Sequence, residues 1–274
     1  MKKLGGVNVT DMKTYLQDIR KRKDLILYLV KSGLKAEHRN SYLGYFWWLL
    51  DPLLNVLVYY FLVVVILGRE SQEFSYAVFL VIGLVVWRWI SSAINASSKS
   101  ILRYSSIINQ VYLPKAIFPL SFTITQLVNF MFGIVVIAIF LIAYGVTPGW
   151  QVVYLPYLIL VTLVFLLAIG FVLGFITIFV RDIENIISHI IRIFFYASPI
   201  IWEESRLARL GPEYTWITEA NPIAIIITSF RDILMFNSSP DFFGLTVILV
   251  ISSAVLVYML YYYSKHEHKI IKAL

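Results

Sequence analysis

The sequence contains no cysteine and few charged residues. Of its 274 residues, none is cysteine, and Asp, Glu, Lys and Arg together make up 14%. The absence of cysteine excludes disulfide bonds and thiolate metal sites. The chain is instead 59% hydrophobic, with a mean hydropathy of +0.79, which exceeds what a soluble core of this length needs. A membrane protein is therefore the leading class.

Several catalytic and nucleotide-binding motifs are also missing. The sequence has no G-x-x-x-x-G-K-[ST] loop, no G-x-G-x-x-G and no H-E-x-x-H. The histidines of "KHEHK" (Lys265 to Lys269) have the wrong spacing for two ligands on one helical face, so we expect a solvated basic tail and no metal site. Asp51 is the only carboxylate away from the ends of an expected span, which leaves paired-acid catalysis and a proton relay without their residues. We therefore expect no cofactor in this chain and no enzymatic activity.

The apolar residues fall into windows that are separated by polar, charged or Gly/Pro breaks. A helix needs about 20 apolar residues to cross roughly 30 Å of hydrocarbon. We therefore expect an all-α integral membrane protein, with a cytoplasmic N-terminus over residues 1–45 and one membrane domain over residues 46–274. The six expected spans are Phe46 to Leu67, Tyr76 to Ala96, Phe118 to Ala143, Val152 to Val180, Ile183 to Trp202 and Phe242 to Tyr263.

The distribution of positive charge predicts the orientation of these spans. Six spans place both termini on one side of the membrane, and seventeen of the 23 Lys and Arg residues then lie on that side, with four in the opposite loops. The positive-inside rule thus predicts a multi-pass protein of the cell membrane with both termini in the cytoplasm. Because the basic residues cluster at chain ends and beside apolar segments, topology explains the net charge of +7 better than binding to nucleic acid does.

Three shorter segments flank the spans. The stretch from Asp24 to Arg39 has a broad apolar side with Lys31 and Lys35 beside it, and we interpret it as an amphipathic helix in contact with membrane lipid at the interface. Residues 99–115 carry apolar residues at near-helical spacing, which predicts a short cytoplasmic helix. Residues 203–236 contain an apolar run that is too short to span and is interrupted by charge, which indicates re-entrant or interfacial helices on the outer side.

Polar residues inside the spans are costly in lipid and are therefore candidates for function. In the fifth span, His189, Arg192 and Tyr196 share one helical face with Asn185. That face is either a polar seam against a neighbouring helix or the wall of a polar substrate path. Arg88 in the second span either pairs with Asp51 or meets a phosphate group.

Four stretches together resemble one protein family. "NSYLGYFWWLLDPLL", "LPKAIFPL", "IFVRDIENIISHIIRIFFYASPII" and "NPIAIIITSFRDIL" are similar, in the same order, to stretches of type-2 ABC exporter permeases for cell-surface polysaccharides, namely wall teichoic acid, O-antigen and capsule. The resemblance implies a homodimer that engages two separate ABC ATPase subunits, on which ATP and Mg²⁺ bind. It also implies a polymer cargo linked to polyprenyl pyrophosphate, and general likeness favours wall teichoic acid.

The resemblance also implies roles for individual residues. Arg181 and Asp182 would fix the turn before the fifth span or contact the headgroup of the carrier, and residues 203–236 would form an outer gate. The substrate path would be lined by Trp48, Asn55, Tyr59, His189, Arg192 and Tyr196, with Arg88 as a further candidate. The ATPase would be met by Asp24, Lys31, Lys35, Ile101, Tyr104, Ile108 and Tyr112.

Three alternative functions are open at this point. O-antigen or capsular polysaccharide could be the cargo in place of teichoic acid. A drug or small-lipid exporter could use the same permease fold. A membrane glycosyl or acyl transferase acting on the same carrier would work without an ATPase, although the sequence offers no paired acids and no nucleophile with a base for it.

Overall fold

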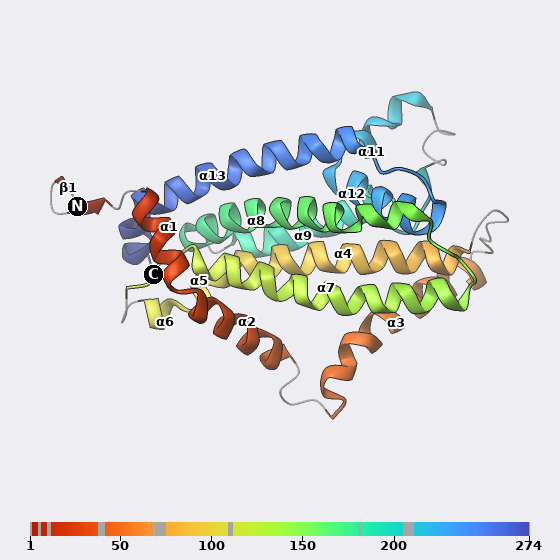
Figure 1. Ribbon diagram of the computed structural model, residues 1–274, viewed down its shortest axis with the longest axis horizontal. Helices are drawn as coiled ribbons and strands as arrows, with labels where there is room; N and C mark the ends of the chain where they lie inside the picture. The colour runs from red at the N-terminus through yellow and green to blue at the C-terminus, as the bar shows by residue number, and fades with distance from the viewer. Residues whose placement is uncertain are drawn as a thin grey trace.

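The chain forms an elongated bundle of helices. The computed structural model describes residues 2–4, 7–9, 12–37, 42–66, 68, 75–108, 112–180, 182–204 and 211–273. In this part of the chain the only strands are β1 (Lys2–Leu4) and β2 (Val7–Val9), which pair as a small antiparallel hairpin. Both termini lie at one end of the bundle, whereas α11 (Trp216–Glu219) and α12 (Pro222–Arg231) lie at the other (Figure 1).

Four helices among the described residues are long and apolar enough to cross a membrane. They correspond to the second, third, fourth and sixth expected spans, which confirms the class of helical membrane protein. These helices are α4 (Tyr76–Ser98), α7 (Ile117–Ala143), α8 (Leu155–Phe179) with the preceding turn η3 (Trp150–Tyr154), and α13 (Phe242–Ala273).

The first and fifth expected spans are shorter helices. After the turn η1 (Gly44–Phe46), α3 (Trp47–Tyr60) continues into the wider π-helical turn η2 (Phe61–Ile66). Helix α9 (Ile183–Ala197) has 15 residues and ends at Ser198, whose extended backbone precedes a proline. At 1.5 Å per residue α9 is only about 22 Å long, which is less than the hydrocarbon thickness. The count of six spans therefore stays a prediction.

The expected single cytoplasmic helix over residues 99–115 is wrong in detail. The chain forms two helical turns there, α5 (Ser100–Arg103) and α6 (Ser105–Ile108), with a break at Tyr104. Serine side chains in this region bond to the nearby backbone, as the Ser100 hydroxyl does to the carbonyl of Ser97 at 2.6 Å. Such local bonds compete with a continuous helix.

The segments outside the long helices gather at the two ends of the bundle. At the end with the termini, α1 (Met12–Lys21) and α2 (Lys23–Glu37) lie near α5 and α6 (Figure 1). Helix α2 packs against α7 and leaves Leu27 and Tyr28 exposed, as an amphipathic helix at an interface would. Between α9 and α13, the helices described in the segment that we expect on the outer side are η4 (Pro212–Tyr214), α11, α12 and η5 (Asp232–Phe236).

Helix α4 is the centre of the bundle. It contacts α3, α7, α8, α9 and α12, and every side chain from Tyr76 to Val86 is buried. Near its C-terminal end it approaches α8 closely, because Gly170 and Gly174 of α8 face Ser97. A Cβ atom on Gly170 would lie 2.8 Å from the Cβ of Ser97, so only glycine allows this contact.

Candidate functional site

An ion pair joins α3 to α4. One guanidinium nitrogen of Arg88 on α4 lies 2.7 Å from a carboxylate oxygen of Asp51 on α3. Both side chains are only partly exposed, at 43% and 35%. Pairing lowers the cost of each charge in an apolar environment. The sequence left two partners open for Arg88, namely Asp51 and a phosphate group. In the structure Arg88 pairs with Asp51.

A cavity of about 540 Å³ lies between α3, α4 and α9, and we call it the α3–α9 cavity. It brings together five residues that the sequence assigned to the substrate path. These residues are Asn55, Tyr59, Arg88, Arg192 and Tyr196, and they lie beside Ser91, Ser92 and Ser188. The wall thus combines hydroxyl and amide groups with guanidinium groups, which can bind polar or phosphorylated ligands.

Aromatic rings form the apolar part of this cavity. The Phe195 ring lies 5.7 Å from that of Tyr59, 5.5 Å from that of Trp87 and 5.2 Å from that of Tyr196. Ring pairs at these distances are favourable and hold the side chains in fixed positions. The aromatic wall and the polar wall therefore face the same space.

Two other residues expected in the path are placed differently. His189 is exposed on α9 and does not line the α3–α9 cavity. It lies one residue from Ser188 and three from Arg192, which both line the cavity, so the helical face that the sequence indicates is broader than the cavity wall. The side chain of Trp48 lies outside the described part of the structure.

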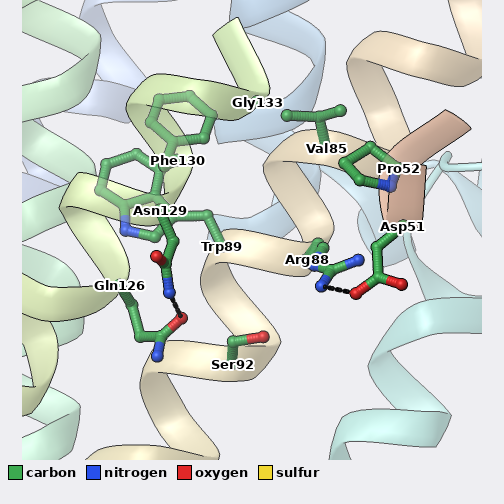
Figure 2. Close-up of a pocket in the computed structure, with 10 residues that line it drawn as sticks. All are labelled: Asp51, Pro52, Val85, Arg88, Trp89, Ser92, Gln126, Asn129, Phe130 and Gly133. Carbon is green, nitrogen blue, oxygen red and sulfur yellow. Dashed lines mark hydrogen bonds and ion pairs between the residues drawn. The ribbon is translucent and has the colours of Figure 1, made fainter. Parts of the chain in front are cut away.

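A smaller pocket of about 280 Å³ lies on the other side of Arg88, between α3, α4 and α7, and we call it the α7 pocket. Figure 2 shows the Arg88–Asp51 pair on one side of it and Gln126 and Asn129 on the other. The amide of Asn129 donates to the side-chain oxygen of Gln126 at 3.1 Å. These two amides are not among the site residues predicted from the sequence, although polar groups within an apolar span were the available signal.

Arg231 is a second residue whose position the sequence analysis missed. The positive-inside count placed it in an outer loop, but it is 2% exposed and packs inside the bundle. Its guanidinium donates to the carbonyl of Phe79 on α4 at 3.1 Å, to that of Ile200 at 2.9 Å and to that of Pro199. It also lies 3.4 Å above the Phe79 ring. One side chain thus joins α12, the start of α4 and the segment after α9.

The end of the bundle that holds the termini contains a buried polar cluster. The carboxylate of Glu267 accepts from the Tyr112 hydroxyl and from the backbone N–H of Lys115, both at 2.9 Å. The Tyr15 hydroxyl accepts from the backbone N–H of Ala116 at 3.3 Å. Burial lowers the pKa of Lys115 below its usual value, and the nearby Glu267 opposes that shift. The expected solvated tail is therefore wrong at Glu267, because buried donors need its carboxylate.

The residues expected to meet an ATPase divide into inward and outward groups. Ile101 and Ile108 are buried in the chain, and Tyr104 stacks on Phe118 with ring centroids 5.3 Å apart. The exposed members of this set are Asp24, Lys31, Lys35 and Tyr112, to which the structure adds Ile107.

The turn before α9 is described only in part. Asp182 is exposed, and its side chain caps no helix N–H, so a role in fixing the turn falls to its backbone carbonyl, which accepts from Asn185. Arg181 lies outside the described residues. Near this turn, Lys99 and Glu184 form an ion pair of 3.0 Å between the α5 region and α9.

A bundle of long apolar helices with polar cavities between them is the architecture of a helical membrane protein with room for polar ligands. Residues 24–235 match the family of ABC-2 type transporters, and the chain belongs to this family. It is 28% identical over 241 residues to the O-antigen export system permease protein RfbA of Myxococcus xanthus, covering 88% of this chain and 92% of that protein. It is 30% identical over 213 residues to the protein of the same name from Klebsiella pneumoniae, covering 77% of this chain and 80% of that protein.

We expect Arg231→Gln to destabilise the fold strongly. The shorter amide cannot reach three carbonyls, and each buried acceptor left without a donor costs about 1–3 kcal/mol. Thermal unfolding of the purified chain in detergent should show a melting temperature several degrees lower than that of the wild type. Arg20→Gln, at an exposed position of α1, is the matched control and should leave the melting temperature unchanged. Equal melting temperatures for the two variants would contradict the assigned role of Arg231.

Proposed function

We propose that this chain is the permease subunit of an ATP-driven exporter that moves a polyprenyl-pyrophosphate-linked polysaccharide across the cell membrane. The observation that carries the proposal is the similarity to O-antigen export permeases over 77–88% of the chain, within a family match over residues 24–235. The proposal includes six spans with both termini in the cytoplasm, where α3 with η2 and α9 would complete the set of four long helices.

The cargo is more closely related to O-antigen than to wall teichoic acid. The sequence analysis favoured teichoic acid by general likeness, but the relatives reported above are O-antigen export permeases. A capsular polysaccharide is chemically close to O-antigen and stays an alternative. A drug or small lipid is the more distant alternative.

The α3–α9 cavity suits such a cargo. Tyr59, Phe195 and Tyr196 offer ring faces against which the C–H faces of sugars can pack. Arg192 supplies a guanidinium that can bind the phosphates of the carrier bidentately. His189 and Trp48 belong to the same proposed path, and Arg181 and Asp182 to the entry of the carrier headgroup.

ATP hydrolysis would take place on two partner ATPase subunits, because this chain has no phosphate-binding loop. The partners would dock on the exposed residues near α2, α5 and α6. The outer segment of η4, α11, α12 and η5 would form the gate at the opposite end of the bundle.

A second copy of the chain would cover the outer surfaces of α3 and α9. Leu57 and Val58 on α3 and Ile190 and Ile193 on α9 are exposed apolar residues on the two helices that line the α3–α9 cavity. Covering them with a second copy would enclose the cavity between two subunits.

Transport in reconstituted vesicles tests the proposed function. The chain is purified with candidate ABC ATPases and supplied with lipid-linked O-antigen, lipid-linked teichoic acid or a drug. We expect ATP-dependent movement of the O-antigen substrate and little of the other two. A stable chain that binds no ATPase and moves no polymer would contradict the proposal.

We expect Ile107→Asp to weaken the coupling between ATP hydrolysis and transport. Ile107 is 46% exposed on α6, so a carboxylate there disturbs a partner surface without disturbing the core. Pull-down of the ATPase and export should both fall, while the melting temperature stays unchanged. Ile108→Asp is the informative comparison, because Ile108 is 3% exposed and a charge there should lower the melting temperature instead. Normal export by the Ile107 variant would argue against this docking surface.

The absence of native cysteine allows a clean cross-linking test of the dimer. A chain carrying Val58→Cys and Ile193→Cys should form a covalent dimer on mild oxidation in membranes. A chain that carries only Phe243→Cys, at an exposed position at the start of α13, is the control. It should run as a monomer on a denaturing gel. Cross-linking that is equal at both sets of positions would speak against an α3–α9 interface.

A further inference from the structure

The α7 pocket gathers polar groups from three helices, of which α4 and α7 are long and apolar enough to span a membrane. Asp51 comes from α3, Arg88 and Ser92 from α4, and Gln126 and Asn129 from α7 (Figure 2). Gln126 is only 8% exposed, although it lies in a helix apolar enough to span the membrane. Amides and charges inside membrane spans mark functional sites by default. In this chain such groups converge on one pocket, and the pocket is therefore a candidate functional site.

Trp89, one of the residues that line the pocket, has a buried donor with no acceptor in the described part of the chain. The indole of Trp89 lines the pocket and is 2% exposed, but no protein group there accepts a hydrogen bond from its Nε1–H. Its ring is held by stacking on Phe130, with centroids 4.1 Å apart. A buried N–H that lacks an acceptor costs free energy. A ligand with an oxygen acceptor would remove this cost.

The charges in the pocket indicate the chemistry of that ligand. The guanidinium of Arg88 is neutralised by the carboxylate of Asp51 at 2.7 Å, so the pair adds no net charge. The other polar groups are an indole N–H, a hydroxyl and two amides, which are neutral donors and acceptors. Such a lining favours an uncharged, hydroxyl-rich group over a phosphate or an acyl chain.

The size and position of the pocket restrict the ligand further. Its volume of about 280 Å³ is below the range of about 300–1,000 Å³ that holds drug-sized ligands, so it suits one ring better than a chain. Pro52, Val85 and Phe130 supply an apolar wall. Because Arg88 and Ser92 also line the α3–α9 cavity, the pocket lies directly beside that cavity.

We propose that the α7 pocket is a binding subsite for a single uncharged sugar residue of the exported polysaccharide. The proposal rests on the proposed function, which supplies the polymer. In this subsite Trp89 would donate to a sugar oxygen, and Gln126 and Ser92 would exchange hydrogen bonds with sugar hydroxyls. Trp89 and Gln126 are therefore assigned as specificity-determining residues.

Ligand-observed NMR on the full chain in lipid nanodiscs tests the subsite. The probes are the methyl glycosides of glucose, galactose, mannose and N-acetylglucosamine, with inorganic pyrophosphate as the anionic probe. Loss of one hydrogen bond weakens binding about fivefold. We therefore expect Trp89→Phe, which keeps an aromatic ring but removes the N–H, and Gln126→Leu each to raise the dissociation constant of at least one glycoside by about that factor.

Asn95→Leu is the matched control. It removes an amide from α4 that donates to the carbonyl of Ser91 but does not line the pocket, so glycoside binding should stay at the wild-type level. Melting temperatures of all three variants show whether any change in binding is due to unfolding. Any of three results would overturn the subsite. The wild type binds no glycoside, all variants bind the glycosides equally, or the Trp89 and Gln126 variants lose pyrophosphate binding and keep glycoside binding.

The transport assay with lipid-linked O-antigen separates this failure from failure of the proposed function. If the wild-type chain moves the polymer but binds no glycoside through Trp89 and Gln126, only the subsite is wrong. If the wild-type chain and its ATPase move no polymer, the proposed function is wrong, and the subsite falls with it.

Discussion

The structure depends on the burial of α4. This helix is enclosed by five others, so its buried polar groups must be satisfied within the protein and not by water. At its N-terminal end the partner is Arg231 of α12, in the middle Arg88 pairs with Asp51 of α3, and near its C-terminal end Ser97 bonds to a threonine of α7. An unmatched group would cost more here than on a surface. These contacts therefore set the positions of α12, α3 and α7 around one axis.

The middle contact also organises the candidate site. Arg88 lines both cavities, and its side chain forms part of the wall between them. Because Asp51 neutralises it, the α7 pocket has no net charge from this wall, whereas Arg192 leaves the α3–α9 cavity with a second guanidinium. The two spaces therefore differ in electrostatics although they share residues. The α3–α9 cavity is therefore better suited to phosphate, and the α7 pocket to neutral hydroxylated groups.

The amino-acid sequence predicts those features that depend on composition or on a scarcity of partners. The four long spans follow from windows of about 20 apolar residues, and Asp51 as one of two possible partners for Arg88 follows from the rarity of charge within the expected spans. The role of Arg231 could not be predicted in this way, because its partners are backbone carbonyls, which any residue supplies. For Ile101 and Ile108, spacing identified an apolar face, but a pattern does not tell whether that face packs within the chain or on a partner. In the structure it packs within the chain.

Under the proposed function an ATPase would displace α5, and the contacts around α5 indicate where that displacement would be transmitted first. The ion pair of Lys99 and Glu184 connects this region to α9, but its side chains are 51% and 30% exposed, and a pair of that kind contributes only about 0–1 kcal/mol. The contact with α8 is much tighter: a Cβ atom on Gly174 would lie 3.1 Å from the carbonyl oxygen of Ser97 and 3.6 Å from the hydroxyl of Ser100. Close-packed helices resist deformation, so a shift of α5 is passed to α8 and α4 before it reaches α9. Since α4 is one continuous helix that carries Arg88, such a shift moves the wall that the two cavities share.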